Sequence, residues 1–247
     1  MARFIKFIIY SALTLFTIFA FCIIFLSQVG LETKKFNSLI IEEVKNYNED
    51  VNLEIEKVKI YLSLKNLSNP KLRIKTTNPS LSIDKIEIEL NFIETKIDIF
   101  SYFKNNFVLE KFEISTKDNK IKDIISIAAL ENPSLIVYNL FIKKGFANLN
   151  GFLKFDENGK IADYKINGEI KNAKLSYDKK HSFGNISSEF TYHKDKIIIK
   201  NANFSYNEIK FLSNKIDIAF SDKGRIIVKG NIETKKNTIN SKLLKNI

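Results

Sequence analysis

Hydrophobic and polar positions follow three patterns along the chain of 247 residues, and the first is an unbroken apolar run near its start. Phe7 to Leu26, FIIYSALTLFTIFAFCIIFL, are 20 residues without a charge. About 20 such residues form a helix that crosses about 30 Å of hydrocarbon, so the run predicts a transmembrane helix. It exceeds the roughly 7–15 apolar residues of a signal-peptide core. We therefore expect residues 1–30 to be a permanent anchor.

Charges on either side of this run indicate its orientation. Arg3 and Lys6 precede it, whereas Lys34 and Lys35 follow it and weaken the positive-inside signal. A long downstream region crosses the membrane largely regardless of its charge. We therefore expect a single-pass inner-membrane anchor, with residues 31–247 outside the cytoplasm.

The second pattern is a short amphipathic helix directly after the run. In the stretch KKFNSLIIEEVKNYNED, apolar residues recur at helical spacing, with Glu42, Glu43 and Lys45 off their stripe. The residues of the stripe are Phe36, Leu39, Ile40, Val44 and Tyr47. Such a helix either lies on the membrane surface or covers the apolar end of a sheet, and the second placement is commoner for a helix that leads into strands.

The third pattern is an alternation with a period of two that begins near residue 51 and predicts half-buried β-strands. The clearest case is IDKIEIELNF, in which Ile86, Ile88, Leu90 and Phe92 alternate with charged or polar residues. The same alternation is found at Val58, Ile60, Leu62 and Leu64, at Tyr164 and Ile166, at Ala173, Leu175 and Tyr177, at Ile197 and Ile199, and at Ile216, Ile218 and Phe220. The region after the anchor is therefore expected to be mainly β.

Turn residues between these strands predict hairpins. The stretches DENGK, HKDK and SDKGR each separate two alternating segments, and short Gly, Asn and Asp turns join antiparallel neighbours. An up-and-down meander is the simplest topology. Helical spacing in KIKDIISIAALEN predicts one helix at 118–131, and FSYFKNN predicts a further helical turn. This helical interruption marks a candidate boundary within the domain near 118–132.

The three prolines, Pro70, Pro79 and Pro133, all occur in Asn-Pro pairs followed by an apolar alternation. Proline lacks the N–H that a strand interior needs, so it is tolerated at the first residue of a strand or on an edge strand. Each pair is therefore expected to mark the start of a strand. The strands predicted in this way would carry Leu72 and Ile74, Leu81 and Ile83, and Leu135 and Val137 on one face.

Composition and charge narrow the function. The net charge is +11, but only Arg3, Arg73 and Arg225 are arginine among the 39 basic residues, and lysines are interleaved with 28 acids in every segment. Nucleic-acid-binding proteins usually gather arginine on one face for bidentate contacts. A solvated lysine surface is the better interpretation, and no nucleic-acid partner is expected.

Catalytic chemistry is not indicated by any motif. His181 and His193 lie in turn-like stretches without a cysteine or acid at the spacing of metal ligands, and Cys22 lies in the apolar run. There is no nucleophile elbow and no phosphate-binding glycine loop. We expect a non-enzymatic protein without a metal, a cofactor or a disulfide.

The order of these elements resembles the AsmA-like family of Gram-negative bacteria, the group that includes TamB and YhdP. The resemblance lies in the anchor, the short helix and four segments, and it is greatest for the N-terminal region of YhdP-like proteins. The segments are VNLEIEKVKIYLSLKNLSNPKLRIKT, NPSLSIDKIEIELNF, DIFSYFKNNFVLEKFEIS and NPSLIVYNLFIKKGFANLNGFLKFDENGKI. It rests on spacing and apolarity, with no catalytic residue among them.

The resemblance implies an anchor in a bacterial inner membrane and a periplasmic domain over residues 31–247. This domain would be a long, curved antiparallel sheet that forms an open groove, with an apolar inside for phospholipid acyl chains. Family members are thought to carry phospholipid toward the outer membrane. The residues that match the groove-lining pattern are Ile60, Leu62, Ile74, Ile83, Ile86, Ile88, Leu90, Leu135 and Val137. A single-layer sheet with one apolar face needs such a cover, because helical residues are too few to supply it.

Several alternatives stay open at this point. A β-sandwich would give the same alternation. The protein could also be a scaffold for outer-membrane or secretion machinery, or resemble LptC, the anchored β-jellyroll of lipopolysaccharide export, although a helix at 118–131 does not suit that fold. The chain stops right after a predicted strand, so either the reading frame is truncated or the last strand docks edge to edge with another β-groove or an outer-membrane protein.

Overall fold

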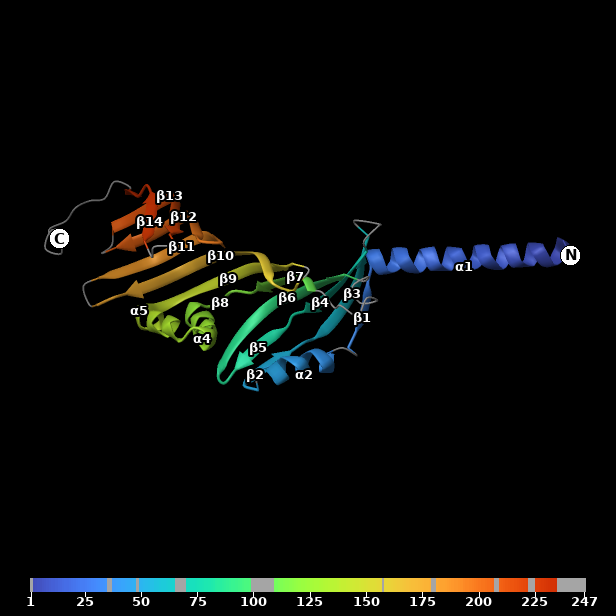
Figure 1. Cartoon of the computed structure of the whole chain (residues 1–247). Helices are drawn as coiled ribbons and strands as arrows, with labels where there is room; N and C mark the ends of the chain where they lie inside the picture. The colour runs from blue at the N-terminus through green and yellow to red at the C-terminus, as the bar shows by residue number, and fades with distance from the viewer. Residues whose placement is uncertain are drawn as a thin grey trace.

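The structure, a computed structural model, describes residues 2–34, 37–47, 49–64, 70–98, 109–156, 158–178, 181–206, 209–221 and 225–234. These residues form a long N-terminal helix, one large antiparallel sheet and a few short helices (Figure 1). The helices are α1 (Ala2–Gln28), α2 (Asn37–Tyr47), α4 (Ile121–Glu131), the 3₁₀-helix η1 (Pro133–Val137) and α5 (Tyr138–Phe141). The strands are β1 (Leu31–Thr33), β2 (Val51–Glu54), β3 (Lys57–Ser63), β4 (Lys71–Thr77), β5 (Ser80–Ile83), β6 (Ile86–Asp98), β7 (Leu109–Thr116), β8 (Asn119–Lys120), β9 (Ile142–Phe155), β10 (Ile161–Ser176), β11 (Ser182–His193), β12 (Lys196–Tyr206), β13 (Ile209–Phe220), β14 (Ile226–Gly230) and β15 (Glu233–Thr234).

The sheet is an open meander, as the sequence predicts. Its strand order is β1-β3-β4-β6-β7-β9-β10-β11-β12-β13-β14, and every pair of neighbours is antiparallel. The three predicted hairpins are confirmed, because Phe155 faces Ile161, Tyr192 faces Ile197, and Phe220 faces Ile226. In the described residues all strands belong to one sheet and β1 and β14 do not pair with each other, so the sheet is open and not a closed barrel.

The first two Asn-Pro pairs stand where strands begin, as expected. Pro70 directly precedes β4, and Pro79 directly precedes β5. β4 and β5 both pair with β6, on either side of a bend at Asn78 and Pro79. The pairing continues across the bend, since Asn78 N–H donates to the Asn91 carbonyl at 3.2 Å and Leu90 N–H donates to the Pro79 carbonyl at 3.0 Å. Pro79 is fully buried at this bend, where its missing N–H leaves no unpaired donor.

The third Asn-Pro pair is different, and the prediction of a strand at this place is wrong. Pro133 is the first residue of η1, whose N-cap is Asn132, and the Asn132 side chain accepts a hydrogen bond from Ser134 N–H. Proline suits a helix start as well as a strand start, because its fixed φ matches both and its N–H would be free in either. Leu135 and Val137 consequently lie in a 3₁₀-helix and not on the sheet.

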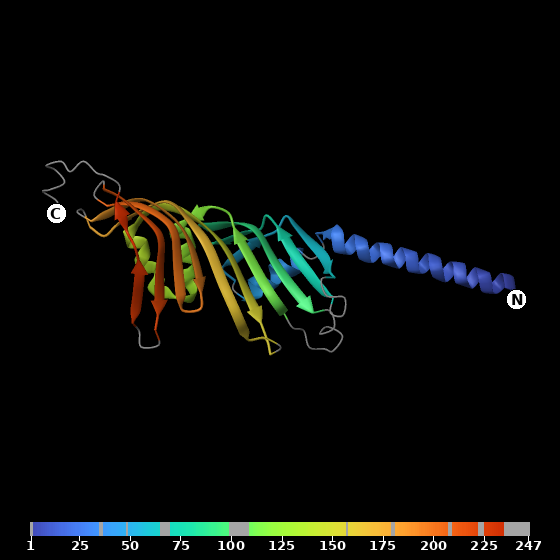
Figure 2. The ribbon, with the colours of Figure 1, turned by 90° about the horizontal axis from the view of Figure 1, so that it is seen from above.

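Asparagines in the left-handed conformation lie at the bends of three neighbouring strands, β10, β11 and β12. Asn172 in β10, Asn185 in β11 and Asn201 in β12 all have positive φ, at 50°, 51° and 51°. Irregular register accompanies Asn172 and Asn185. Asparagine tolerates the left-handed region better than most residues, and bulges increase the bend and twist of a strand. Figure 2 shows the result, in which the strands are bowed into an arch with α2 and α4 on its inner side.

Two predicted helices are confirmed, and they cover one end of the strands. α2 packs against β2, and Asn37 Nδ2 donates to the Ile55 carbonyl at 2.9 Å, which favours the sheet-covering placement. α4 contacts β6, β8 and β9. The helical turn predicted in FSYFKNN lies outside the described residues.

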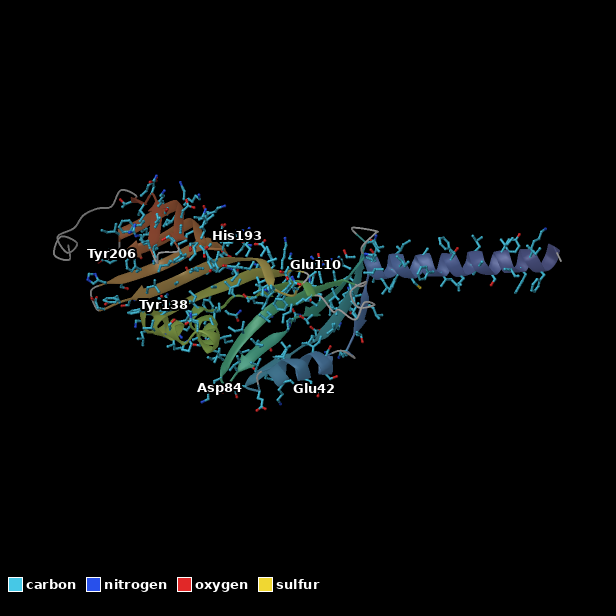
Figure 3. All side chains as sticks on the ribbon, in the orientation of Figure 1. Glu42, Asp84, Glu110, Tyr138, His193 and Tyr206 are labelled. Carbon is cyan, nitrogen blue, oxygen red and sulfur yellow. The ribbon has the colours of Figure 1, made fainter. Side chains whose placement is uncertain are left out.

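Most of α1 is exposed, and its half-buried residues lie toward its C-terminal end, where it contacts β3. An 18-residue stretch within Phe4–Gln28 has a mean hydropathy of 2.4, and the side chains of α1 project on all sides (Figure 3). By length and composition this is a helix that can cross a membrane. Two residues after α1, Gly30 has a φ of +74° and lies so close to β3 that a Cβ atom would be 2.8 Å from the Ile60 carbonyl oxygen. Leu31 then starts β1 opposite Ile60.

Candidate functional site: the apolar face of the sheet

The register places apolar side chains of successive strands on one face, which we call the apolar face. Directly opposite residues of an antiparallel pair share a face. One row of opposite residues runs from β3 to β10 through Ile60, Ile74, Thr95, Phe112, Leu153 and Tyr164. A parallel row runs from β6 to β14 through Ile93, Ile114, Gly151, Ile166, Tyr192, Ile197, Ile218 and Val228. The face is therefore apolar over the length of the sheet.

The helix α4 covers part of this face. Ala147 and Gly145 continue the alternation of β9 beyond Gly151, and a Cβ atom on Gly145 would lie 2.9 Å from Cδ1 of Ile121 in α4. Most of the buried apolar residues of the described part of the chain lie on β2 to β9. These include Leu53, Val58, Ile83, Ile88, Leu90, Ile97 and Ile142.

From β10 to β14 the apolar face has no comparable cover, and we call this part the open half. Among its described apolar residues only Ala173 and Ala202 are buried. Ile197, Ile199, Ile216 and Ile218 are half-buried, and every residue of β14 is exposed. The open half is therefore the part of the sheet that is available to an apolar ligand.

The predicted lining residues divide into three groups. Ile60, Leu62, Ile74 and Ile86 are half-buried on the sheet, whereas Ile83, Ile88 and Leu90 are buried as core. Leu135 and Val137 lie on η1, as described above. The prediction missed Ile199, Ile216 and the other residues of the open half, although their alternation is visible in the sequence.

Aromatic side chains lie along the strands of the open half. Near one end Tyr164 and Tyr192 pack with ring centroids 5.6 Å apart. The hydrogen bond between their hydroxyls, at 3.4 Å, raises the pKa of Tyr164 to about 12. Near the other end Phe204 stacks on Phe211 at 5.3 Å, and a further ring, Phe183, packs on Tyr206 at 4.9 Å. Such flat apolar surfaces suit contact with hydrocarbon.

The opposite face of the sheet is ionic. Arg73 forms a two-pronged pair with Glu94, with Nε–Oε1 at 2.7 Å and Nη2–Oε2 at 2.9 Å. Partial burial alone would raise the pKa of Glu113, but hydrogen bonds from Lys111 and Lys96 lower it below its usual value. Lysines also lie over aromatic rings, as with Lys75 at 4.1 Å from the Phe92 centroid. Much of the basic charge on this face is thus paired with acids.

Titratable groups form no reactive constellation in the described part of the chain. His193 Nε2 lies 3.0 Å from Asp163 Oδ1, and His181 Nδ1 lies 2.7 Å from the Tyr206 hydroxyl. Sequence spacing missed these partners because they come from other strands. Within the described residues there is no group of three His, Cys, Asp or Glu side chains that could hold a metal ion.

Comparisons with known proteins give no match, since no family model, no curated protein and no solved structure is significantly similar to the chain. The resemblance to the AsmA-like family therefore stays a prediction from the sequence.

Proposed function

We propose that this protein is a non-enzymatic lipid carrier, anchored in a bacterial inner membrane by α1, whose apolar sheet face binds phospholipid acyl chains in the periplasm. It would conduct them along the sheet toward the outer membrane. The observation that carries the proposal is the open half of the apolar face. The resemblance to AsmA-like proteins points in the same direction.

Burial of apolar surface supports this function energetically. Each Å² of apolar surface removed from water contributes roughly 25 cal/mol, and an exposed apolar area beyond a few hundred Å² usually marks an interaction site. Acyl chains fit the open half because they need only an aliphatic and aromatic lining, while the headgroup stays in water at the ends of the strands. The β10–β13 residues described above supply both the aliphatic and the aromatic part of this lining.

The position of α1 suits transport away from a membrane. α1 leaves the sheet at the β1 and β3 end, and β13 and β14 lie at the opposite end (Figure 1). With α1 in a bilayer, successive strands lead away from that bilayer. A lipid that enters near β3 would then move across strands that present the same apolar face.

A vesicle assay tests this function. The full chain is reconstituted in donor vesicles that contain a fluorescent phospholipid, and its transfer to acceptor vesicles is followed. We expect acceleration by the wild type, a loss of at least tenfold with Ile199→Glu on the apolar face, and wild-type rates with Lys200→Glu on the other face. Circular dichroism checks that both variants fold. Equal rates for Ile199→Glu and the wild type would refute the proposal.

A scaffold function is the second candidate, and the exposed strand β14 favours it. All five residues of β14 are exposed, and an unpaired edge is a template for another chain. A pure scaffold would retain its partner contacts in Ile199→Glu and would not transfer lipid in any variant.

A further inference from the structure

The two ends of the sheet differ in how their edges are protected. β1 has three residues, follows directly on α1, and carries Glu32, which pairs with Lys59 at 3.2 Å and Lys57 at 3.7 Å. Short, charged strands are a common protection against edge pairing. β14 instead presents Ile226, Ile227 and Val228 consecutively, with 63%, 48% and 62% of their surface exposed.

Among the described strands, β14 pairs with β13 alone, and no described strand lies at its second edge. The β14 sequence, IIVKG, contains no proline and no charge on the apolar face. A strand at a free edge seldom has exposed apolar side chains on both of its faces. These features distinguish β14 from an ordinary solvated edge.

A second copy of this chain does not fit β14 when α1 is in a membrane. Antiparallel pairing of two β14 strands would place the two α1 helices at opposite ends of the joined sheet, pointing in opposite directions (Figures 1 and 2). Pairing of β14 with the β1 edge of another copy would place that copy's α1 a full sheet length from the first bilayer. Either arrangement separates anchors that must share one membrane.

We propose that β14 receives a β-strand from a different polypeptide by antiparallel strand addition. The residue pairs between β13 and β14 indicate which side chains suit the added strand. Val228, opposite Ile218, extends the apolar row, so the added strand carries an apolar residue beside Val228 and another beside Ile226. Lys229 lies opposite Asp217 on the ionic face, and an acid beside Lys229 complements its charge. The added strand thus prolongs both faces of the sheet. The proposal rests on the anchor in the proposed function and does not require lipid binding.

Peptide binding tests the proposal on the full chain in nanodiscs. The probe is a fluorescent, acetylated Thr-Val-Glu-Val-Thr-Val-Glu amide, which places valine and acid on opposite faces. The control peptide has the same sequence with N-methyl groups on alternate residues, which remove one edge of donors. We expect binding of the probe alone and at least tenfold slower hydrogen exchange in β14, with no change in β1.

Two variants make the test specific. Val228→Lys places a charge on the apolar face and is expected to weaken probe binding at least tenfold, whereas the matched Ile227→Lys on the other face weakens it less than threefold. Probe binding is expected to survive Ile199→Glu, so failure of lipid transfer and failure of strand addition are distinguishable.

Four results would overturn the proposal. These are no protection of β14, equal binding of the N-methylated peptide, a disulfide-linked homodimer formed by Val228→Cys in nanodiscs, or probe binding that occurs only when the chain is shortened to end at Thr234. The third result would assign β14 to a second copy, and the fourth to the chain's own last residues.

Discussion

Gly145 on β9 lies so close to Ala173 on β10 that a Cβ atom on the glycine would be 2.6 Å from the Ala173 Cα. The same Cβ atom would approach Ile121 of α4. The φ of Gly145 is +137°, which L side chains rarely adopt. A residue without a Cβ atom is therefore needed at this position, where β9 meets both β10 and α4.

The first prediction concerns this contact. Gly145→Ala combines backbone strain with a clash against buried backbone, so it is expected to lower the free energy of unfolding by about 3 kcal/mol or more. Gly159→Ala is the matched control, because Gly159 also has a positive φ, +76°, but nothing lies within 4 Å of its Cβ position. It is expected to cost about 1 kcal/mol. Thermal denaturation of both variants measures the difference, and equal costs would contradict the role of the contact.

A second prediction addresses the asparagine bend. Asn185 is exposed with a φ of 51°, so Asn185→Gly is expected to change stability by less than about 0.5 kcal/mol. Asn185→Val suits a regular strand but not the left-handed region, and is expected to cost about 1–2 kcal/mol. Chemical denaturation compares the two. A stabilising valine would show that the bend does not depend on this residue.

Much of the fold follows from the sequence because alternation and turn chemistry are local. Ile86, Ile88 and Leu90 lie on a strand and are at least half-buried, as their period of two predicts, and all three glycine or aspartate hairpins form. The bends do not follow in the same way. Asn172 and Asn185 look like ordinary polar positions of strands, and only their backbone angles show that they interrupt the alternation.

The sequence predicts that the candidate site is an apolar face of the sheet, but not which part of that face is uncovered. Periodicity shows that Ile88 and Ile199 both face an apolar side, but not which of them a helix covers, because coverage depends on where α2 and α4 pack. Pro133 is misleading for a related reason, since proline is compatible with the start of a strand and with the first turn of a helix. The Asn-Pro pair is the same at all three prolines, and only in the structure does the Asn132 side chain cap η1.

A third prediction concerns the ion pair on the opposite face. Glu94 is 4% exposed, so removing its partner with Arg73→Met leaves a buried carboxylate without its two-pronged pair. The expected cost is about 2–3 kcal/mol. The double variant Arg73→Met/Glu94→Met removes both charges and is expected to be more stable than the single one. If the double variant were less stable than Arg73→Met, the ion pair would contribute net stability beyond supplying a partner for the buried Glu94 carboxylate.

The fourth prediction is a pH dependence at Glu113. Its pKa in the folded state is lowered by Lys111 and Lys96, so its contribution to stability is present above the unfolded value of 4.5 and is lost as the pH falls through the folded value. Glu113→Gln is expected to lower the free energy of unfolding by about 0.5–1 kcal/mol at pH 7. The difference from wild type should shrink below pH 4.5. A constant difference from pH 7 down to about pH 3 would argue against this pairing.

The central claim, that the open half binds acyl chains, is tested most directly by photo-crosslinking in cells. A benzophenone amino acid is placed at Ile199 on the apolar face or at the adjacent Lys200 on the opposite face, and lipids joined to the protein are identified by mass spectrometry. The account predicts phospholipid adducts at Ile199 and few or none at Lys200. Absence of lipid at Ile199, or equal amounts at both positions, would contradict it.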